Sequence, residues 1–171
     1  IPVANVAPLV TAKSCDEEIR IPRNTPFSLT GSATDADGDA ITYTWEQYDE
    51  DGEDILTQGF IGAQAGNSAI APLLRSFPPS PSATRYFPQL TTLVEGANSD
   101  VFQVLPNRAR TLNFQLTARD NNALGGGIAS DDVEVVVDNN GPLTLSNVSN
   151  QDAGSSFMIS WNLNGTEALC D

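Results

Sequence analysis

Histidine is absent from this chain, and basic residues are scarce, with 8 Lys and Arg against 22 Asp and Glu. Without an imidazole the chain cannot supply a Ser-His-Asp or Cys-His pair, a His-Glu zinc motif or a histidine acid–base catalyst. Pairs of carboxylates, which glycosidases use, are available, but none forms a recognisable cleft pattern. We therefore expect that this chain is not an enzyme.

The low content of basic residues gives a formal net charge of −14 and a pI near 4.1. Such a surface repels phosphate backbones and anionic lipids, so we expect neither nucleic-acid binding nor membrane insertion. No apolar run approaches membrane-spanning length, and Ile1-Pro2-Val3 does not resemble a signal peptide. The chain therefore looks like an excised or processed piece of something longer. An acidic surface serves solubility and also attracts divalent cations.

Cysteine is nearly absent too, with only Cys15 and Cys170 near opposite ends of the chain. Neither belongs to a CxxC motif or a Cys/His cluster, which excludes a structural zinc site. A disulfide between the two and a pair of isolated cysteines both remain open.

Short runs with period-two alternation dominate the chain, and no amphipathic helix is evident. β-Branched and aromatic residues fill these runs, and Gly, Pro, Asn and Asp separate them. We predict strands at residues 26–30, 41–46, 112–118 and 133–137. The pattern predicts an all-β, immunoglobulin-like β-sandwich, in which Trp45 packs in the core of the third strand. A long insertion separates this third strand from the penultimate strand.

Asp138-Asn139-Asn140-Gly141-Pro142 indicates a domain boundary. Residues 1–140 are predicted to form the sandwich. Residues 141–171 contain two strand-like runs, at 143–146 and 157–162, which are too short to bury a core alone. They form either the first strands of a second, truncated β-module or a hairpin docked on the first domain.

The clearest candidate site is the turn that contains Asp35, Asp37 and Asp39, in which carboxylates alternate with Ala36 and Gly38. Calcium takes six to eight oxygen ligands, so such a loop suits it better than magnesium, which keeps its waters. The spacing is superficially that of an EF-hand, with Glu46 at the twelfth position. The segment after Asp39 reads as a strand, however, which places Glu46 about 20 Å away at roughly 3.3 Å per residue.

The remaining ligands must then come from other loops at the same end of the sandwich. In an immunoglobulin-like topology the loop between the last two strands lies there, and so does the start of the first strand. We predict a calcium site made of Asp35, Asp37, Asp39 and Asp120, with Asn5 and Asp131 as additions. The alternative is a solvated Asp/Gly turn. The acidic run at 49–54 is either a second ion site or a solvated loop.

Several segments together resemble a known module. They are residues 25–39, 43–47, 74–77, 85–88, 104–106, 110–121 and 159–162. The chain resembles the immunoglobulin-like (PKD/cadherin-like) module that follows the catalytic domain in bacterial secreted reprolysin-type zinc metalloproteases. The Arg85-Tyr86-Phe87-Pro88 segment and the run from Asn113 to Asn121 are the most particular matches.

The resemblance implies an exported protein, secreted or at the cell surface, with the zinc motif in an upstream catalytic domain of the same polypeptide. It also implies a second sandwich-like module that begins near Leu143. Similar sequences often carry cysteines where this chain has Thr44 and Ile128. A disulfide there is impossible, so the ion site is expected to bear more of the stabilisation.

Two functions follow from these patterns. The first is a non-catalytic accessory module that spaces, stabilises or targets a secreted bacterial metalloprotease. The second is a calcium-dependent adhesion or binding module of the cell surface, which contacts an extracellular protein or polysaccharide. Its candidate contacts are Arg75, Arg85 and Tyr86, although we favour for these residues Arg–carboxylate and aromatic packing that fixes the long insertion. An aromatic fraction of 7% offers few platforms for carbohydrate.

Overall fold

A computed structural model describes residues 4–13, 18–49, 62–96, 100–142, 144–145 and 158–164. Strands dominate it, and its two helical segments, η1 (Gly62–Asn67) and α2 (Leu90–Glu95), have six residues each. The all-β prediction is confirmed. The strands are β1 (Leu9–Thr11), β2 (Ile19–Pro22), β3 (Phe27–Thr30), β4 (Ser32–Thr34), β5 (Thr42–Gln47), β6 (Thr84–Phe87), β7 (Arg110–Arg119), β8 (Ile128–Asp138), β9 (Thr144–Leu145) and β10 (Trp161–Asn162).

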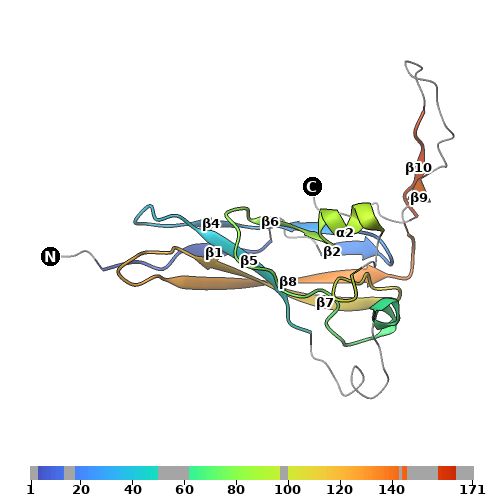
Figure 1. Ribbon diagram of the computed structural model, residues 1–171, viewed down its shortest axis with the longest axis horizontal. Helices are drawn as coiled ribbons and strands as arrows, with labels where there is room; N and C mark the ends of the chain where they lie inside the picture. Colours follow the sequence, from blue (N-terminus) through green and yellow to red (C-terminus); the bar gives the residue numbers. More distant parts are fainter. Residues whose placement is uncertain are drawn as a thin grey trace.

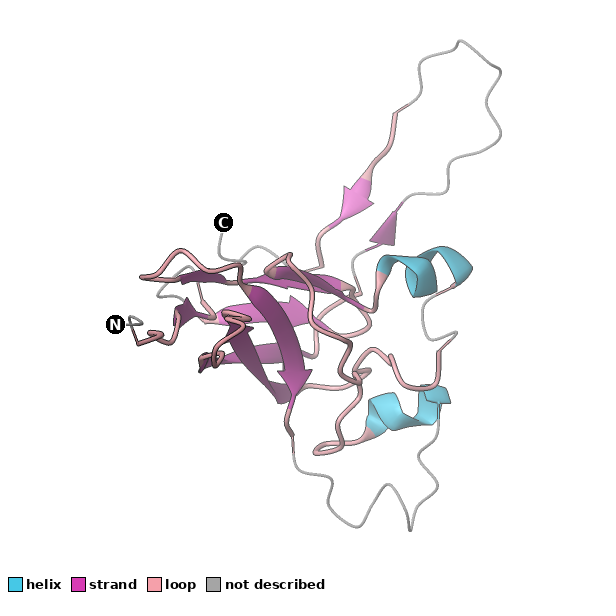
Figure 2. Cartoon of the chain, turned by 60° about the vertical axis from the view of Figure 1, so that its left-hand side comes forward, coloured by secondary structure: helices cyan, strands magenta, loops and turns pink. Residues whose placement is uncertain are grey.

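The largest sheet has four strands in the order β2-β8-β7-β5. β2 runs parallel to β8, whereas the other neighbours are antiparallel. Two antiparallel pairs, β1–β4 and β3–β6, lie over this sheet and give the molecule a sandwich-like layering (Figures 1 and 2). β5 therefore lies at one edge of the large sheet and β2 at the other.

Alternation along the strands produces the core between the layers. Leu112, Phe114 and Leu116 of β7 are fully buried, and Val133 and Val135 of β8 pack beside them. On the opposite layer Phe27 and Phe87 stack with their ring centroids 5.0 Å apart, and Phe87 lies 4.9 Å from Phe114. These aromatic contacts join β3 and β6 to the large sheet.

Trp45 packs in this core, as the sequence predicts, with only 3% of its surface exposed. Its indole N–H donates to the carbonyl of Ala83 at 2.8 Å, which satisfies its one polar group. Gly31, between β3 and β4, lets the backbone lie directly against the side chains of Leu116 and Trp45. A Cβ atom there would lie 2.2 Å from Leu116 Cδ2 and 2.8 Å from the carbonyl oxygen of Thr11, so a larger residue does not fit.

The insertion between β5 and β7 contains more structure than the sequence suggested. β6 lies within it and pairs with β3 in the register Phe27 to Phe87. β6 has only four residues and lies between a Pro-rich segment and a cis-proline, so its alternation is too short to predict a strand. The short strands β2 and β4 were not predicted either, because their four and three residues give too short a run of period-two alternation.

Thr44 and Ile128, where similar sequences carry cysteines, lie on strands that are separated by β7. Thr44 is opposite Thr117, and Ile128 is opposite Arg119. The guanidinium of Arg119 donates to the Thr44 hydroxyl at 3.1 Å, so a hydrogen bond ties β5 to β7 at this position.

The C-terminal strands β9 and β10 form an antiparallel pair in which Trp161 lies opposite Leu145. In both views this hairpin extends away from the sandwich (Figures 1 and 2). Its side chains are largely exposed, including Leu145 and Trp161. Cys15, Cys170 and residues 50–54 of the acidic run lie outside the described residues.

Candidate metal centre

The acidic turn joins β4 to β5 and is shaped by its own backbone. The carboxylate of Asp35 accepts hydrogen bonds from the amides of Asp37 and Asp39, at 2.9 and 3.0 Å. Gly38 has φ of +80°, a left-handed conformation that glycine adopts without strain. As a result, one carboxylate oxygen from each of the three aspartates lies within 4.8 Å of the others.

Asp120, directly after β7, is the second part of the centre and is almost fully buried, with 1% of its surface exposed. Its carboxylate accepts hydrogen bonds from Asn5 Nδ2 at 2.7 Å, from the Gly127 amide at 2.8 Å and from the Asn122 amide at 3.1 Å. The Asn5 hydrogen bond, followed by the backbone amides, lowers the pKa of Asp120, and burial opposes this only partly. The group is therefore an anion at neutral pH.

Two hydrogen bonds connect the turn to the rest of this end of the molecule. Asn122 Nδ2 donates to Asp39 at 2.8 Å, and the Val6 amide donates to Asp37 at 2.8 Å. The turn, the β7–β8 loop and the N-terminal segment thus meet at one place. The carboxylates of Asp35, Asp37 and Asp39 form one cluster, and at the same end of the molecule Asn5 binds Asp120 across 115 residues.

The donor set suits a hard cation. Carboxylate and amide oxygens are the ligands that calcium prefers. Asn5 Oδ1 and Asp35 Oδ2 are buried and have no hydrogen-bond partner within the described part of the chain. These two oxygens are candidates to complete the coordination of an ion.

A glycine brings the backbones together here. A Cβ atom on Gly127 would lie 2.6 Å from Ala7 Cα and 2.7 Å from Asp120 Oδ2. Glycine at this position therefore allows the N-terminal segment to pass directly over the β7–β8 loop.

The structure does not place Asp131 with the other candidates. It lies in β8 opposite Leu116, and its carboxylate accepts the amide of Ala12 at 2.8 Å. It holds the far end of β1 against β8. Glu46 does not approach the turn either, because it lies within β5 and accepts the hydroxyl of Ser76 at 2.8 Å.

The sequence prediction missed Asn122 and Asn121. Asn121 has φ of +56°, and its side chain donates to the carbonyl of Ala40 at 2.9 Å, next to the acidic turn. Together the two asparagines join the β7–β8 loop to the β4–β5 turn. The Asp-Asn-Asn run after a predicted strand was the available signal, since Asn tolerates the left-handed region and bonds nearby backbone.

The described part of the second acidic run has a structural role. Asp49 is buried and forms an ion pair with Arg110 at 3.2 Å. It also accepts hydrogen bonds from the amide and side chain of Asn113, at 3.1 and 2.6 Å, and from Gln47. The carboxylate of Asp49 therefore stabilises the fold through its contacts with Arg110 and Asn113 of β7.

The fold and this cluster of carboxylates define an acidic, mostly-β, sandwich-like protein with a candidate divalent-cation centre. Comparisons with protein-family models, with curated proteins and with solved structures found no match. Neither of the six-residue helical segments described above has the length to cross a membrane.

Proposed function

We propose that this chain is a non-catalytic, calcium-stabilised module of a secreted or cell-surface protein, with an immunoglobulin-like sandwich fold. The observation that carries the proposal is the cluster of three turn carboxylates, which Asn122 links to the loop that follows the buried Asp120. Four aspartates at one end of a fold repel one another, and a bound cation offsets that repulsion.

The topology supports the immunoglobulin-like part of the proposal. Such folds pack two layers of strands face to face over a common core. Here β1 pairs with β4 in one layer and β2 runs parallel to β8 in the other. Trp45 is buried in the core, as the tryptophan of immunoglobulin-like domains is, although it lies on the fifth strand of this chain rather than the third.

The resemblance noted above supports a more specific role as the accessory module of a secreted bacterial metalloprotease. In that role the module spaces, stabilises or targets an upstream catalytic domain, and its contacts are that domain and an extracellular protein or polysaccharide. This role places the histidine ligands of the zinc ion in the upstream domain, which agrees with the lack of histidine in this chain.

The calcium proposal is tested by thermal unfolding in excess EDTA and in calcium. Ion binding to the folded state alone raises stability by about 2.7 kcal/mol at a hundredfold excess over Kd. We expect a Tm several degrees higher in calcium, and a smaller effect of magnesium. A Tm that is identical in calcium and EDTA contradicts the proposal.

The gene context separates the two candidate roles. An upstream His-Glu-x-x-His segment in the same reading frame supports the protease accessory role. Tandem copies of this module without such a segment favour the calcium-dependent adhesion module instead.

A further inference from the structure

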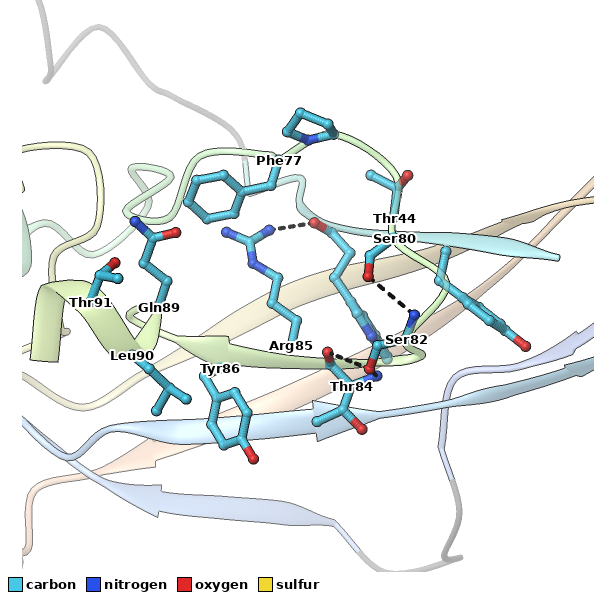
Figure 3. A pocket seen from close by; sticks show the side chains of 13 residues that line it. Thr44, Phe77, Ser80, Ser82, Thr84, Arg85, Tyr86, Gln89, Leu90 and Thr91 are labelled. Carbon is cyan, nitrogen blue, oxygen red and sulfur yellow. Dashed lines mark hydrogen bonds between the residues drawn. The ribbon is translucent and has the colours of Figure 1, made fainter.

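A cavity of about 340 Å³ opens beside β5 and β6, the neighbouring edges of the two layers (Figure 3). The segment from Phe77 to Ser82 crosses it, and the start of α2 closes one side. None of the residues of the candidate metal centre lines it. The volume lies within the range of small-ligand pockets, which are about 300–1,000 Å³.

The walls of the cavity are mostly apolar. Aromatic side chains supply much of the lining, namely Tyr43, Trp45, Phe77 and Tyr86. Tyr86 and Leu90 are about half exposed, at 46% and 55%, so they stand at the mouth. Gln89 and Thr91 add an amide and a hydroxyl to the lining. Such a lining favours a ligand with an apolar body and few polar groups.

One cation lies in this lining. The guanidinium of Arg85 is held between the rings of Phe77 and Phe87, 4.5 Å from each centroid. It donates to the carbonyls of Trp45 and Arg75, both at 2.5 Å. These two bonds use two of its five N–H groups, and Figure 3 shows the side chain beside Phe77.

The charge of Arg85 is not neutralised by an ion pair. Within the described ranges no carboxylate lies at ion-pair distance from it, and its buried Nε has no hydrogen-bond partner. Burial lowers the pKa of Arg85 to about 10, and the charge of Glu46 opposes this shift. The group is still a cation at neutral pH, in a chain with a net charge of −14.

We propose that this cavity binds an apolar carboxylate, and specifically the C-terminal residue of a peptide chain. The apolar walls accept the last side chain, and the terminal carboxylate compensates the charge of Arg85. A single carboxylate fits better than a polyanion, because a chain with a net charge of −14 repels repeated negative charge. A peptide end also fits the apolar lining better than a sugar, which presents hydroxyls on every side.

The test uses the intact chain and a matched pair of ligands, N-acetyl-phenylalanine and its carboxamide. The two have nearly the same shape, but the carboxamide is neutral and has an NH2 group in place of one carboxylate oxygen. Binding is followed through the indole N–H resonance of Trp45, which lines the cavity. Only one other tryptophan, Trp161, is present, so Trp161→Phe assigns the signal. We expect saturable millimolar binding of the carboxylate, and at least about fivefold weaker binding of the carboxamide.

A charge at the mouth gives a second test that leaves the core intact. Leu90→Glu places a carboxylate at the entrance and is expected to weaken binding of N-acetyl-phenylalanine at least about fivefold. Leu124→Glu is the matched control, because Leu124 is 90% exposed on the distant β7–β8 loop. This variant carries the same net charge and is expected to bind like the unmodified chain.

Three outcomes of these tests overturn the proposal, and a fourth comes from a different ligand. The first three are equal binding of the carboxamide, equal weakening by the two glutamate variants, and no shift of the Trp45 resonance at saturating ligand. Binding of glucuronate in preference to N-acetyl-phenylalanine also overturns it, in favour of a saccharide site.

Discussion

At the scale of single residues, the same side chain has different roles according to its neighbours. Asp49 is buried against Arg110, and Asp131 holds β1 through the Ala12 amide. Asp120 is buried too, and within the described residues its partners are an asparagine and two backbone amides. Its own loop also reaches the acidic turn through the hydrogen bond from Asn122 to Asp39, whereas the carboxylate of Asp131 accepts the Ala12 and Asp132 amides. Asp120 is therefore the candidate partner for the turn.

Alanine variants of these aspartates test that assignment. Asp37→Ala and Asp120→Ala should each weaken calcium binding at least about tenfold, since each removes a carboxylate from the proposed centre. Asp131→Ala should lower Tm, because it frees the Ala12 amide, and should leave calcium affinity unchanged. Isothermal titration calorimetry at a temperature where all three variants are folded measures the effect. Unchanged affinity of Asp120→Ala returns the site to the turn alone.

Asp100 provides a pH dependence away from the candidate metal centre. Its carboxylate accepts hydrogen bonds from the Gln103 side chain at 2.8 Å and from the Phe102 amide at 2.9 Å, and Arg75 lies 3.6 Å away. These interactions, with Gln103 the largest, lower the pKa of Asp100. A carboxyl whose pKa is lower in the folded than in the unfolded state stabilises the fold above its unfolded pKa, and this stability is lost as the pH falls.

We therefore expect Asp100→Asn to lower Tm at neutral pH, because an amide nitrogen cannot accept the Gln103 hydrogen bond. The Tm difference from the unmodified chain should shrink as the pH falls below the ordinary aspartate pKa of about 4, because the unfolded chain then takes up the proton more readily than folded Asp100 does. Thermal melts in EDTA across this range measure it. A difference that is constant with pH contradicts the assigned cause.

At the scale of elements, the insertion covers the free edge of β5. Ser80 exchanges two backbone hydrogen bonds with Tyr43, at 2.7 and 2.9 Å. Arg85 donates to the Trp45 carbonyl, and Gln47 accepts the amides of residues 73 and 74. An exposed edge strand invites pairing with other chains. The insertion therefore protects the sheet and at the same time forms the wall of the cavity.

Arg110 anchors this insertion. Its side chain is 2% exposed, pairs with Asp49, and donates to the carbonyls of Ser68 and Ala71 at 3.2 and 2.8 Å. Burial lowers its pKa, which the pairing with Asp49 opposes. Three separate partners thus depend on one buried cation.

Arg110→Met is expected to cost about 3–5 kcal/mol of unfolding free energy, because it leaves Asp49 buried without its cation. Arg108→Met is the control, since Arg108 is exposed and makes only a 3.4 Å hydrogen bond to the Asn67 carbonyl. Its cost should stay below about 1 kcal/mol. Urea denaturation measures both variants. Equal costs for the two contradict the anchoring role of Arg110.

At the scale of the whole molecule, the sandwich and the C-terminal hairpin differ in burial, because the first has a packed core and the second has exposed side chains. The chain stays packed on the sandwich as far as Gly141, where an added Cβ atom would lie 2.3 Å from Pro22 Cβ. Beyond it the β9–β10 hairpin extends away and exposes Leu145, Met158 and Trp161 (Figure 1). The described residues of the hairpin therefore contribute nothing to the core of the sandwich.

Truncation after Pro142 tests this division. The shortened chain should unfold cooperatively with a Tm within about 2 °C of the full chain, which corresponds to less than about 1 kcal/mol. Its calcium response should also be retained. A large loss of Tm shows instead that the segment from residue 143 onward packs on the sandwich.

The sequence by itself determined those features that depend on neighbouring residues. Alternation along residues 112–118 and 133–137 marked β7 and β8, whose inward side chains fill the core. Alternating carboxylates around Gly38 marked the acidic turn, because Asx hydrogen bonds and the left-handed glycine act within five residues. The lack of histidine excluded imidazole chemistry in any fold.

Only the tertiary structure decided which distant residues meet. Asn5 reaches Asp120 across 115 residues, and Asn122 reaches Asp39 across 83. Asp120 directly follows β7, whereas Asp131 lies within β8 opposite Leu116, where its carboxylate accepts the Ala12 amide next to β1. Strand register, the close approach of the backbones at Gly127 and burial decide which of these residues contact one another. None of these three can be predicted from the pattern of neighbouring residues. Local sequence therefore predicts the acidic turn of the candidate centre, whereas the fold decides which distant residues lie at the same end of the molecule.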